Sequence, residues 1–236
     1  MQERIQKILS ARGICSRRKA EEYIVQGLVL VNGKPAILGQ KADPEVDEIT
    51  LDGKIVEARK ELLYYVMNKP AGIVTSNVTT ETAPSVRDVL PPNLRGKVFP
   101  IGRLDKDTSG LLLFTNDGVL AYRLTHPRFD HEKEYEVVTT VPIKDGQLRK
   151  LEEGVMIDSE KTKPARIRRT GSSSFCIAIT EGRNRQIRRM CQKVGAPVKN
   201  LRRVRITTLR DPKLSEGKLR PLTDEEKKAM LKSVGL

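Results

Sequence analysis

The sequence predicts an α+β protein with a small amino-terminal domain over residues 1–60 and a larger domain over residues 61–236. The first part shows two short amphipathic helices followed by a pair of strands, an α-α-β-β order. The second part has more strand candidates than helix candidates in mixed order, which is typical of a mixed, largely antiparallel sheet. The charged segment EARKE, residues 57–61, separates the two parts and is predicted to be a linker.

The small domain has clear start and stop signals. Residues 5–9 carry an apolar stripe at helical spacing, and Ser16 can cap a second helix. The strand at residues 28–31 runs into Asn32-Gly33, the strongest two-residue hairpin signal. A further strand, ITL, ends at Asp52-Gly53, so two helices precede two or more strands.

The larger domain is predicted to begin with a buried strand over residues 62–69 that Pro70 stops, with a second strand starting at residues 72–75. A capping box at Thr223 and Glu226 marks the last helix. Further strands are expected at residues 111–115, 135–141, 165–169, 175–180 and 204–209, and helices at residues 119–124, 146–152, 185–194 and 223–232.

The composition excludes several classes of protein. Three scattered cysteines and two histidines separated by Pro127 offer no metal-ligand spacing and no disulfide framework, so we expect neither a metal nor another cofactor. There is no apolar run of roughly 20 residues and no secretory signal at the start, so a soluble, cytoplasmic protein is expected. The net charge of +14, from 44 Lys and Arg against 30 Asp and Glu, favours a polyanionic partner such as nucleic acid.

The positive charge is concentrated in two regions. Residues 161–220 hold 18 basic and 3 acidic residues across an expected strand-helix-strand stretch, which favours a binding surface over an ordinary solvated helix face. The two amino-terminal helices carry another basic face. The residues expected there to contact the phosphates of a folded RNA, together with one lysine of the hairpin, are Arg4, Lys7, Arg12, Arg17, Arg18, Lys19 and Lys34.

The segment GRLDKDTSGLLLFTNDG, residues 102–118, is the densest candidate for chemistry. Asp105 lies between Arg103 and Lys106 in a loop directly before a buried strand, which would hold the carboxylate in position. Neighbouring cations would keep it ionised at neutral pH, as a nucleophile or base requires. On the residues alone, a turn with a salt bridge explains the segment better than catalysis does.

Two resemblances bear on function. SRRKAEEYI followed by VLVNGK resembles the S4-type RNA-binding domain. The segment at residues 102–118 resembles the catalytic-aspartate motif of the ribosomal RNA pseudouridine synthases. Three further stretches resemble the other motifs of that family in the same order: MNKPAGIVTS at residues 67–76, KEYEV at 133–137 and EGRNRQIRRM at 181–190.

The resemblance implies roles for individual residues. Asp105 would be the nucleophile, Tyr135 would stack on an extruded uracil, and Arg188 would pair with Asp105, with Arg189 as its nearest rival. Leu201 would close the pocket beneath the base, although an ordinary core leucine fits equally well. Other expected contacts to substrate or to nearby phosphates are Arg103, Arg183, Arg185, Arg189, Arg202, Arg203, Arg205 and Lys69, the last of which could instead cap a solvent-facing turn.

The implied activity is conversion of uridine to pseudouridine in ribosomal RNA, most simply 23S RNA of the large subunit, by a monomer without a cofactor. The small-subunit 16S RNA and transfer RNA remain alternative substrates. A non-catalytic RNA-binding assembly factor explains the charge but not the Asp105 loop. A glycoside hydrolase using Asp105 and Asp107 is disfavoured by the net positive charge and by the lack of tryptophan.

Overall fold

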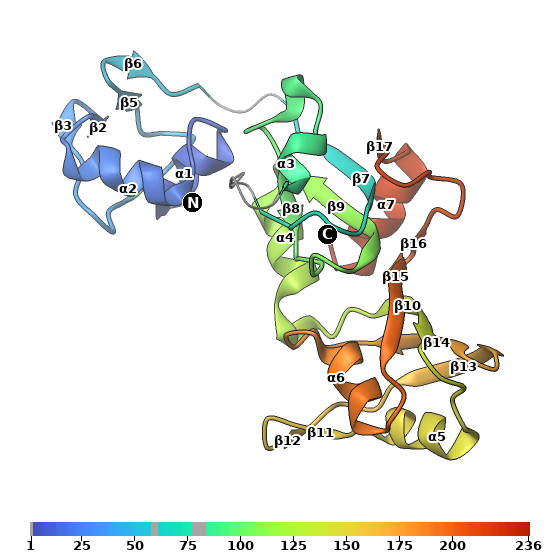
Figure 1. Cartoon of the computed structure of the whole chain (residues 1–236). Helices are drawn as coiled ribbons and strands as arrows, with labels where there is room; N and C mark the ends of the chain where they lie inside the picture. The colour runs from blue at the N-terminus through green and yellow to red at the C-terminus, as the bar shows by residue number, and fades with distance from the viewer. Residues whose placement is uncertain (1, 58–60, 77–83) are drawn as a thin grey trace. The chain divides into compact units, whose positions relative to one another are not determined.

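The computed structural model describes residues 2–57, 61–76 and 84–236. The chain forms two compact units (Figure 1). The first contains the chain up to Leu63 with two short segments, Asn93–Val98 and Asn116–Gly118, and the second contains the remainder. Residues 58–60 of the expected linker lie outside the described residues, and the domain boundary at residue 60 stays a prediction.

The first unit follows the predicted α-α-β-β order. Ser16 caps α2 by accepting a hydrogen bond from the backbone N–H of Lys19 at 3.2 Å, and Ile5, Leu9 and Ala20 are fully buried in its core. The elements are β1 (Glu3–Arg4), α1 (Ile5–Ala11), α2 (Arg17–Val25), β2 (Val29–Val31), β3 (Lys34–Pro35), β4 (Lys41–Ala42), β5 (Ile49–Leu51) and β6 (Lys54–Ile55).

The predicted hairpin turn is confirmed. Asn32 and Gly33 both have positive φ, 51° and 77°, as the turn between β2 and β3 requires. The ITL strand, β5, pairs with the other edge of β2, so the four-stranded sheet has the order β3-β2-β5-β6.

The second unit is built on a nine-stranded sheet with the order β13-β14-β10-β15-β9-β7-β17, with β16 paired to β15 and β8 to β9. Only the β15–β9 pair is parallel, so the predicted mixed, largely antiparallel sheet is confirmed. The strands are β7 (Tyr64–Lys69), β8 (Phe99–Ile101), β9 (Ser109–Thr115), β10 (Lys133–Thr139), β13 (Arg166–Gly171), β14 (Ser174–Ile179), β15 (Val198–Ile206), β16 (Leu209–Arg210) and β17 (Leu219–Pro221). A separate two-stranded sheet pairs β11 (Met156–Ile157) with β12 (Glu160–Lys161).

The four predicted helices of this unit are present, and their ends differ from the prediction by one residue. They are α4 (Gly118–Thr125), α5 (Asp145–Glu153), α6 (Gln186–Lys193) and α7 (Asp224–Ser233); α3 (Val86–Val89) and the short 3₁₀ turns η1 (Pro92–Leu94) and η2 (Pro127–Phe129) complete the elements. The side chains of α4 and α7 share a buried cluster with β7 and β9, which covers one end of the sheet (Figure 1). None of the helices in the described part of the chain is long and apolar enough to cross a membrane.

Two strand predictions were wrong. Residues 72–75 form only an isolated bridge between Val74 and Ser85, because Gly72 turns with φ 92° and its N–H binds the carbonyl of Lys106 instead of a strand. The strand predicted to start at residue 204 starts at Val198. Its polar first half is part of the strand because β10 pairs with it on one side and β9 pairs with residues 202–203 on the other.

Candidate active site

Asp105 lines a cavity of about 290 Å³ beside the large sheet. Tyr135 from β10 and Leu201 from β15 contribute to the lining, together with Ile179 from the end of β14. Tyr135 and Leu201 are 9% and 7% exposed, so the cavity has a largely apolar floor beside one carboxylate. Arg103, Arg183 and Arg185 also line it, as predicted for contacts to an anionic substrate.

The loop that carries Asp105 is held by a neighbouring segment. Thr75 accepts a hydrogen bond from the backbone N–H of Leu104 at 3.1 Å and donates its hydroxyl to the carbonyl of the same residue at 2.8 Å. One side chain therefore satisfies both backbone groups of the residue next to Asp105. The N–H of Gly72 binds the carbonyl of Lys106 at 2.7 Å on the other side, so the loop is fixed on both flanks of the carboxylate.

The pairing of the strand after the loop requires a glycine at position 110. Gly110 lies opposite Arg203 in the parallel pair of β9 and β15 and has φ 109°. A Cβ atom there would lie 2.2 Å from the carbonyl oxygen of Arg203, a distance that real Cβ atoms do not show. Only glycine allows this close approach of the two backbones, and that approach sets where the loop meets the sheet.

The predicted ion pair between Arg188 and Asp105 is wrong. The guanidinium of Arg188 lies 3.2 Å from the carboxylate of Asp107 and donates to the Asp107 carbonyl at 2.8 Å. Arg185 forms a two-pronged pair with the same carboxylate at 2.9 and 3.0 Å. The reason is the turn at residues 106–107, which presents the second aspartate to α6, while Asp105 faces the cavity.

These contacts set the charge state of the loop. Hydrogen bonding from Arg185, together with the charge of Arg188, holds the pKa of Asp107 below its ordinary value. Arg185 itself has φ 49°, an unfavourable conformation for a residue with a side chain, and its pair with Asp107 restrains it there. Asp105 makes no ion pair with any described side chain.

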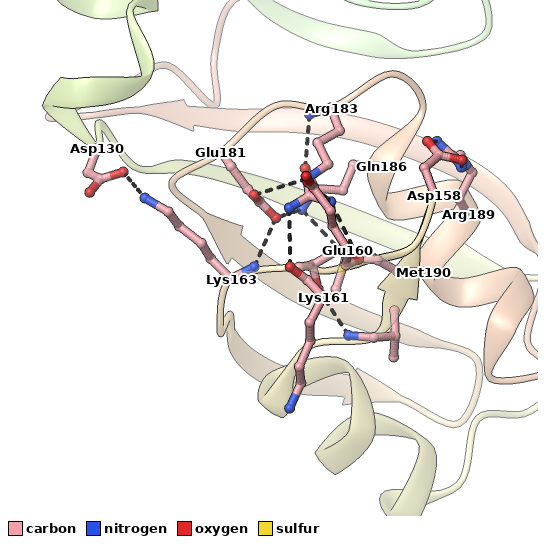
Figure 2. Close-up of polar contacts among 12 residues, drawn as sticks. Asp130, Asp158, Glu160, Lys161, Lys163, Glu181, Arg183, Gln186, Arg189 and Met190 are labelled. Atoms are coloured by element: carbon pink, nitrogen blue, oxygen red, sulfur yellow. Dashed lines mark hydrogen bonds and ion pairs between the residues drawn. The ribbon is translucent and has the colours of Figure 1, made fainter.

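The segment that leads into α6 is fixed by its own network (Figure 2). Gln186 accepts from the N–H of Arg183 at 3.0 Å and donates to Glu181 at 2.6 Å, and Glu181 also accepts from the N–H of Lys163 at 3.0 Å. Arg183 reaches the carbonyl of Lys161 at 3.1 Å, so most of its donors are already engaged. Its predicted role in binding stays a prediction.

Two other predicted contacts do not fit the structure. Arg189 forms an ion pair with Asp158, away from the Glu181 network, and does not line the cavity (Figure 2). Its prediction as a substrate contact was wrong because one step along α6 turns the side chain to another face. Lys69 is 0% exposed, which rules out a phosphate contact, whereas the alternative that it caps a turn is confirmed.

Lys69 instead has a structural role. Its amine donates to the carbonyls of Pro70 and Ile73, each at 2.8 Å, and so closes the turn after β7. Burial lowers the pKa of Lys69 to about 8, although the charges of Asp107 and Asp105 act in the opposite direction. The buried ammonium therefore supports the backbone beside the Asp105 loop.

The prediction that Arg203 and Arg205 contact phosphates was also wrong. Arg203 is 4% exposed and donates through Nε to the carbonyl of Leu111 at 2.7 Å. Arg205 pairs with Glu132 and, at 2.8 Å, with Glu134. Both side chains bridge strands, because neighbours across the sheet offer carbonyl and carboxylate oxygens. Arg202 is partly exposed and lies 3.8 Å from Glu136.

The basic face of the amino-terminal unit is smaller than predicted. The prediction that Arg12 contacts RNA phosphates is wrong. Its guanidinium donates to the carbonyls of Pro44 and Val56 and so connects two loops of the unit. Lys7 of α1 pairs with Glu3 of β1, and Lys19 pairs with Glu22 within α2. The remaining predicted contacts are exposed, and they are Arg4, Arg17, Arg18 and Lys34.

Sequence reasoning missed three residues that shape the site. Thr75 lies in a segment predicted to be a strand, and only its distance of 29 residues from Leu104 hid the contact. Asp107 was treated as a second carboxylate for an alternative chemistry, whereas it anchors α6. Gly110 was quoted within a motif without a role; a glycine at the start of an apolar strand is the available signal for a close backbone approach.

The chain was compared with known proteins. The sequence model of the family described as RNA pseudouridylate synthase matches residues 63–193, and that of the S4 domain matches residues 3–46. A solved structure described as a pseudouridylate synthase superposes with a TM-score of 0.72 and 32% identity, over 96% of this chain and 99% of the other.

Two curated relatives extend the match over nearly the whole chain. The dual-specificity RNA pseudouridine synthase RluF of Escherichia coli (strain K12) is 41% identical over 94% of this chain and 76% of its own length. The ribosomal large subunit pseudouridine synthase B of Bacillus subtilis (strain 168) is 40% identical over 97% of this chain and 95% of its own length. Motif order, the Asp105 cavity and these matches agree: the chain belongs to the RNA pseudouridylate synthase family, with an S4 domain at its amino terminus, and is an RNA pseudouridine synthase.

Proposed function

We propose that this enzyme isomerises a uridine of ribosomal RNA, most simply of the 23S RNA of the large subunit, with Asp105 as the nucleophile. The observation that carries the proposal is the position of Asp105, an aspartate without an ion-pair partner among the described residues, in the lining of a cavity that it shares with Tyr135 and Leu201. Ribosomal RNA is supported by the Bacillus subtilis relative, which is described as a ribosomal large subunit pseudouridine synthase.

The geometry suits a base that leaves its stack. A uracil inside a helix cannot reach a carboxylate, so the target nucleotide must be extruded into a pocket. The Tyr135 ring offers a stacking face, and Leu201 closes the apolar floor. Arg103 supplies positive charge in the cavity lining, whereas Arg183 and Arg185, which also line it, are paired with carboxylates and would exchange them for the phosphates of an extruded nucleotide.

The reaction needs one bond exchanged for another. Asp105 attacks either the uracil ring or the ribose carbon, the bond between N1 and C1′ breaks, and a bond from C5 to C1′ forms after the base has turned, with the bond to Asp105 broken to release the free carboxylate. The proton on C5 then leaves to solvent, and N1 gains one. Arg188 acts on this step indirectly, because it holds the loop through Asp107.

A pseudouridine map of large- and small-subunit ribosomal RNA and of transfer RNA tests the proposal. The wild type should modify one large-subunit position, and Asp105→Asn should lose the product while RNA affinity stays within about threefold. Transfer RNA is included because it is an alternative substrate of the implied activity, and the Escherichia coli relative is described as a dual-specificity enzyme. Product from Asp105→Asn at a comparable rate would remove Asp105 as the nucleophile, and a map without product would refute the activity on these RNAs.

A further inference from the structure

A second cavity, of about 420 Å³, adjoins the Asp105 cavity. The two share Arg103, Tyr135, Gly182 and Arg183 in their lining, so they are neighbours on one face of the sheet. Lys133 lies two residues before Tyr135 on β10 and points to the same face. The reaction described above uses only the first cavity, which leaves the larger one without a role.

The second cavity contains polar atoms that lack partners. The Nη2 atom of Arg203 and the Nε2 atom of His131 are buried and have no hydrogen-bond partner among the described residues. Lys133 donates to the carbonyl of His131 at 3.1 Å and forms no ion pair within the described part of the chain. Burial, with the nearby charge of Arg203, lowers the pKa of Lys133 to about 8. Buried donors without partners cost free energy unless a ligand supplies acceptors.

The remaining lining is suited to a flat ring. Ile101, Leu113 and Ile206 contribute apolar surface opposite these donors. A cavity with apolar walls and a few convergent donors is the usual form of a small-ligand site. The donors have positive or neutral charge, so the ligand they fit is rich in acceptor oxygens or nitrogens.

The rim of the cavity adds features typical of contacts to unpaired RNA. His126 and Pro127 of the η2 region line the cavity, and the guanidinium of Arg128 stacks 4.5 Å from the ring centroid of Phe129 and 5.3 Å from that of Tyr122. Arginine and aromatic faces of this kind stack on bases of single-stranded RNA. At another point of the rim, Lys163 pairs with Asp130 (Figure 2).

We propose that the second cavity binds a nucleotide next to the target uridine, with its base between the apolar wall and the η2 rim and an acceptor, either a base atom or a phosphate oxygen, on Lys133. This inference rests on the proposed function, because it requires the target uridine in the first cavity. The enzyme would then extrude two adjacent nucleotides and read the neighbour of its target.

The experiment measures tritium release from an RNA fragment that carries [5-³H]uridine at the mapped position. Four modified RNAs carry either an abasic nucleotide or a neutral methylphosphonate linkage on the 5′ or the 3′ side of the target. Each is assayed with the wild type, with Lys133→Met and with Lys150→Met, which removes an exposed lysine of α5 as a matched control. Thermal unfolding of each variant shows whether it is folded.

With the wild type, one of the four modifications should lower kcat/KM by about tenfold. On the intact RNA, Lys133→Met should lower kcat/KM by about the same factor. On the modified RNA the variant should lose little more, since the two changes remove the same contact. An abasic penalty identifies the base as the source of the acceptor, and a methylphosphonate penalty identifies the phosphate. Lys150→Met should behave as the wild type.

Two results would overturn the inference. The first is a wild-type kcat/KM within twofold of its value on intact RNA for all four modified RNAs. The second is a Lys133→Met enzyme whose loss on the modified RNA equals the product of the losses caused by each change alone. The RNA changes test the cavity in the unaltered enzyme, so a misfolded Lys133→Met variant does not decide the outcome. Failure of the proposed function looks different, because the wild type would then release no tritium from the intact RNA.

Discussion

Replacing Thr75 with valine tests whether the loop that carries Asp105 is held from outside. Valine has nearly the same shape as threonine but lacks the hydroxyl that meets both the N–H and the carbonyl of Leu104, at 3.1 and 2.8 Å. Each intramolecular hydrogen bond contributes about 0.5–1.5 kcal/mol net, so the two contribute about 1–3 kcal/mol to the loop's position. If this energy is lost in the transition state, kcat falls by about 5- to 150-fold.

The assay is the initial rate of tritium release at several RNA concentrations. Thr75→Val should lower kcat and leave KM within about twofold, because Thr75 is not among the residues that line the Asp105 cavity. Thr75→Ser keeps the hydroxyl and should restore most of kcat. A Thr75→Val enzyme with kcat within twofold of the wild type would refute the reasoning, as would a serine variant that is equally slow.

Three further predictions concern the fold, the pH dependence of stability and the RNA contacts. Gly110→Ala should lower the free energy of unfolding by about 2 kcal/mol or more in chemical denaturation, because the new Cβ meets the backbone of Arg203 at a positive φ; an unchanged midpoint would contradict this. Lys69 has a pKa of about 8 instead of 10.5, so between these values the folded chain binds fewer protons than the unfolded chain, and the free energy of unfolding should rise with pH. Lys69→Met should remove part of that rise. An identical slope of unfolding free energy against pH in the variant would contradict the prediction. The double variant Arg17→Ala with Arg18→Ala should reduce the slope of log affinity against log salt by about 1–2, whereas an unchanged slope would mean that α2 does not touch RNA.

The sequence predicted the elements of the site well, since each depends on local signals. The apolar run after Ser109 and the strand around Tyr135 have the length and the residue types of buried strands, so the loop with Asp105 was located at the correct strand end. Local signals also gave the caps at Ser16 and Thr223, whose side chains bind backbone groups only three residues away. Such contacts can be predicted from the residue types at fixed short spacings along the chain.

Contacts between distant segments could not be predicted in the same way. The partner of Arg188 lies 81 residues away, and the turn at residues 106–107 decides whether Arg188 meets Asp105 or Asp107. Arg12 reaches a carbonyl 44 residues away. A count of charges records which side chains exist, whereas their roles depend on which oxygens the fold places within reach.

The pairing of the basic residues changes what the net charge means. Of the 18 Lys and Arg residues between 161 and 220, eleven form ion pairs with carboxylates, and these are Lys163, Arg166, Arg169, Arg183, Arg185, Arg188, Arg189, Arg202, Arg205, Arg210 and Arg220. Most of the partners come from other parts of the chain. A phosphate must compete with a carboxylate for each of these side chains, so far fewer than 18 counterion-releasing contacts are available. The salt dependence of RNA binding should therefore be shallow for a chain of net charge +14, and it should be set by the exposed cations whose donors the fold has not already used.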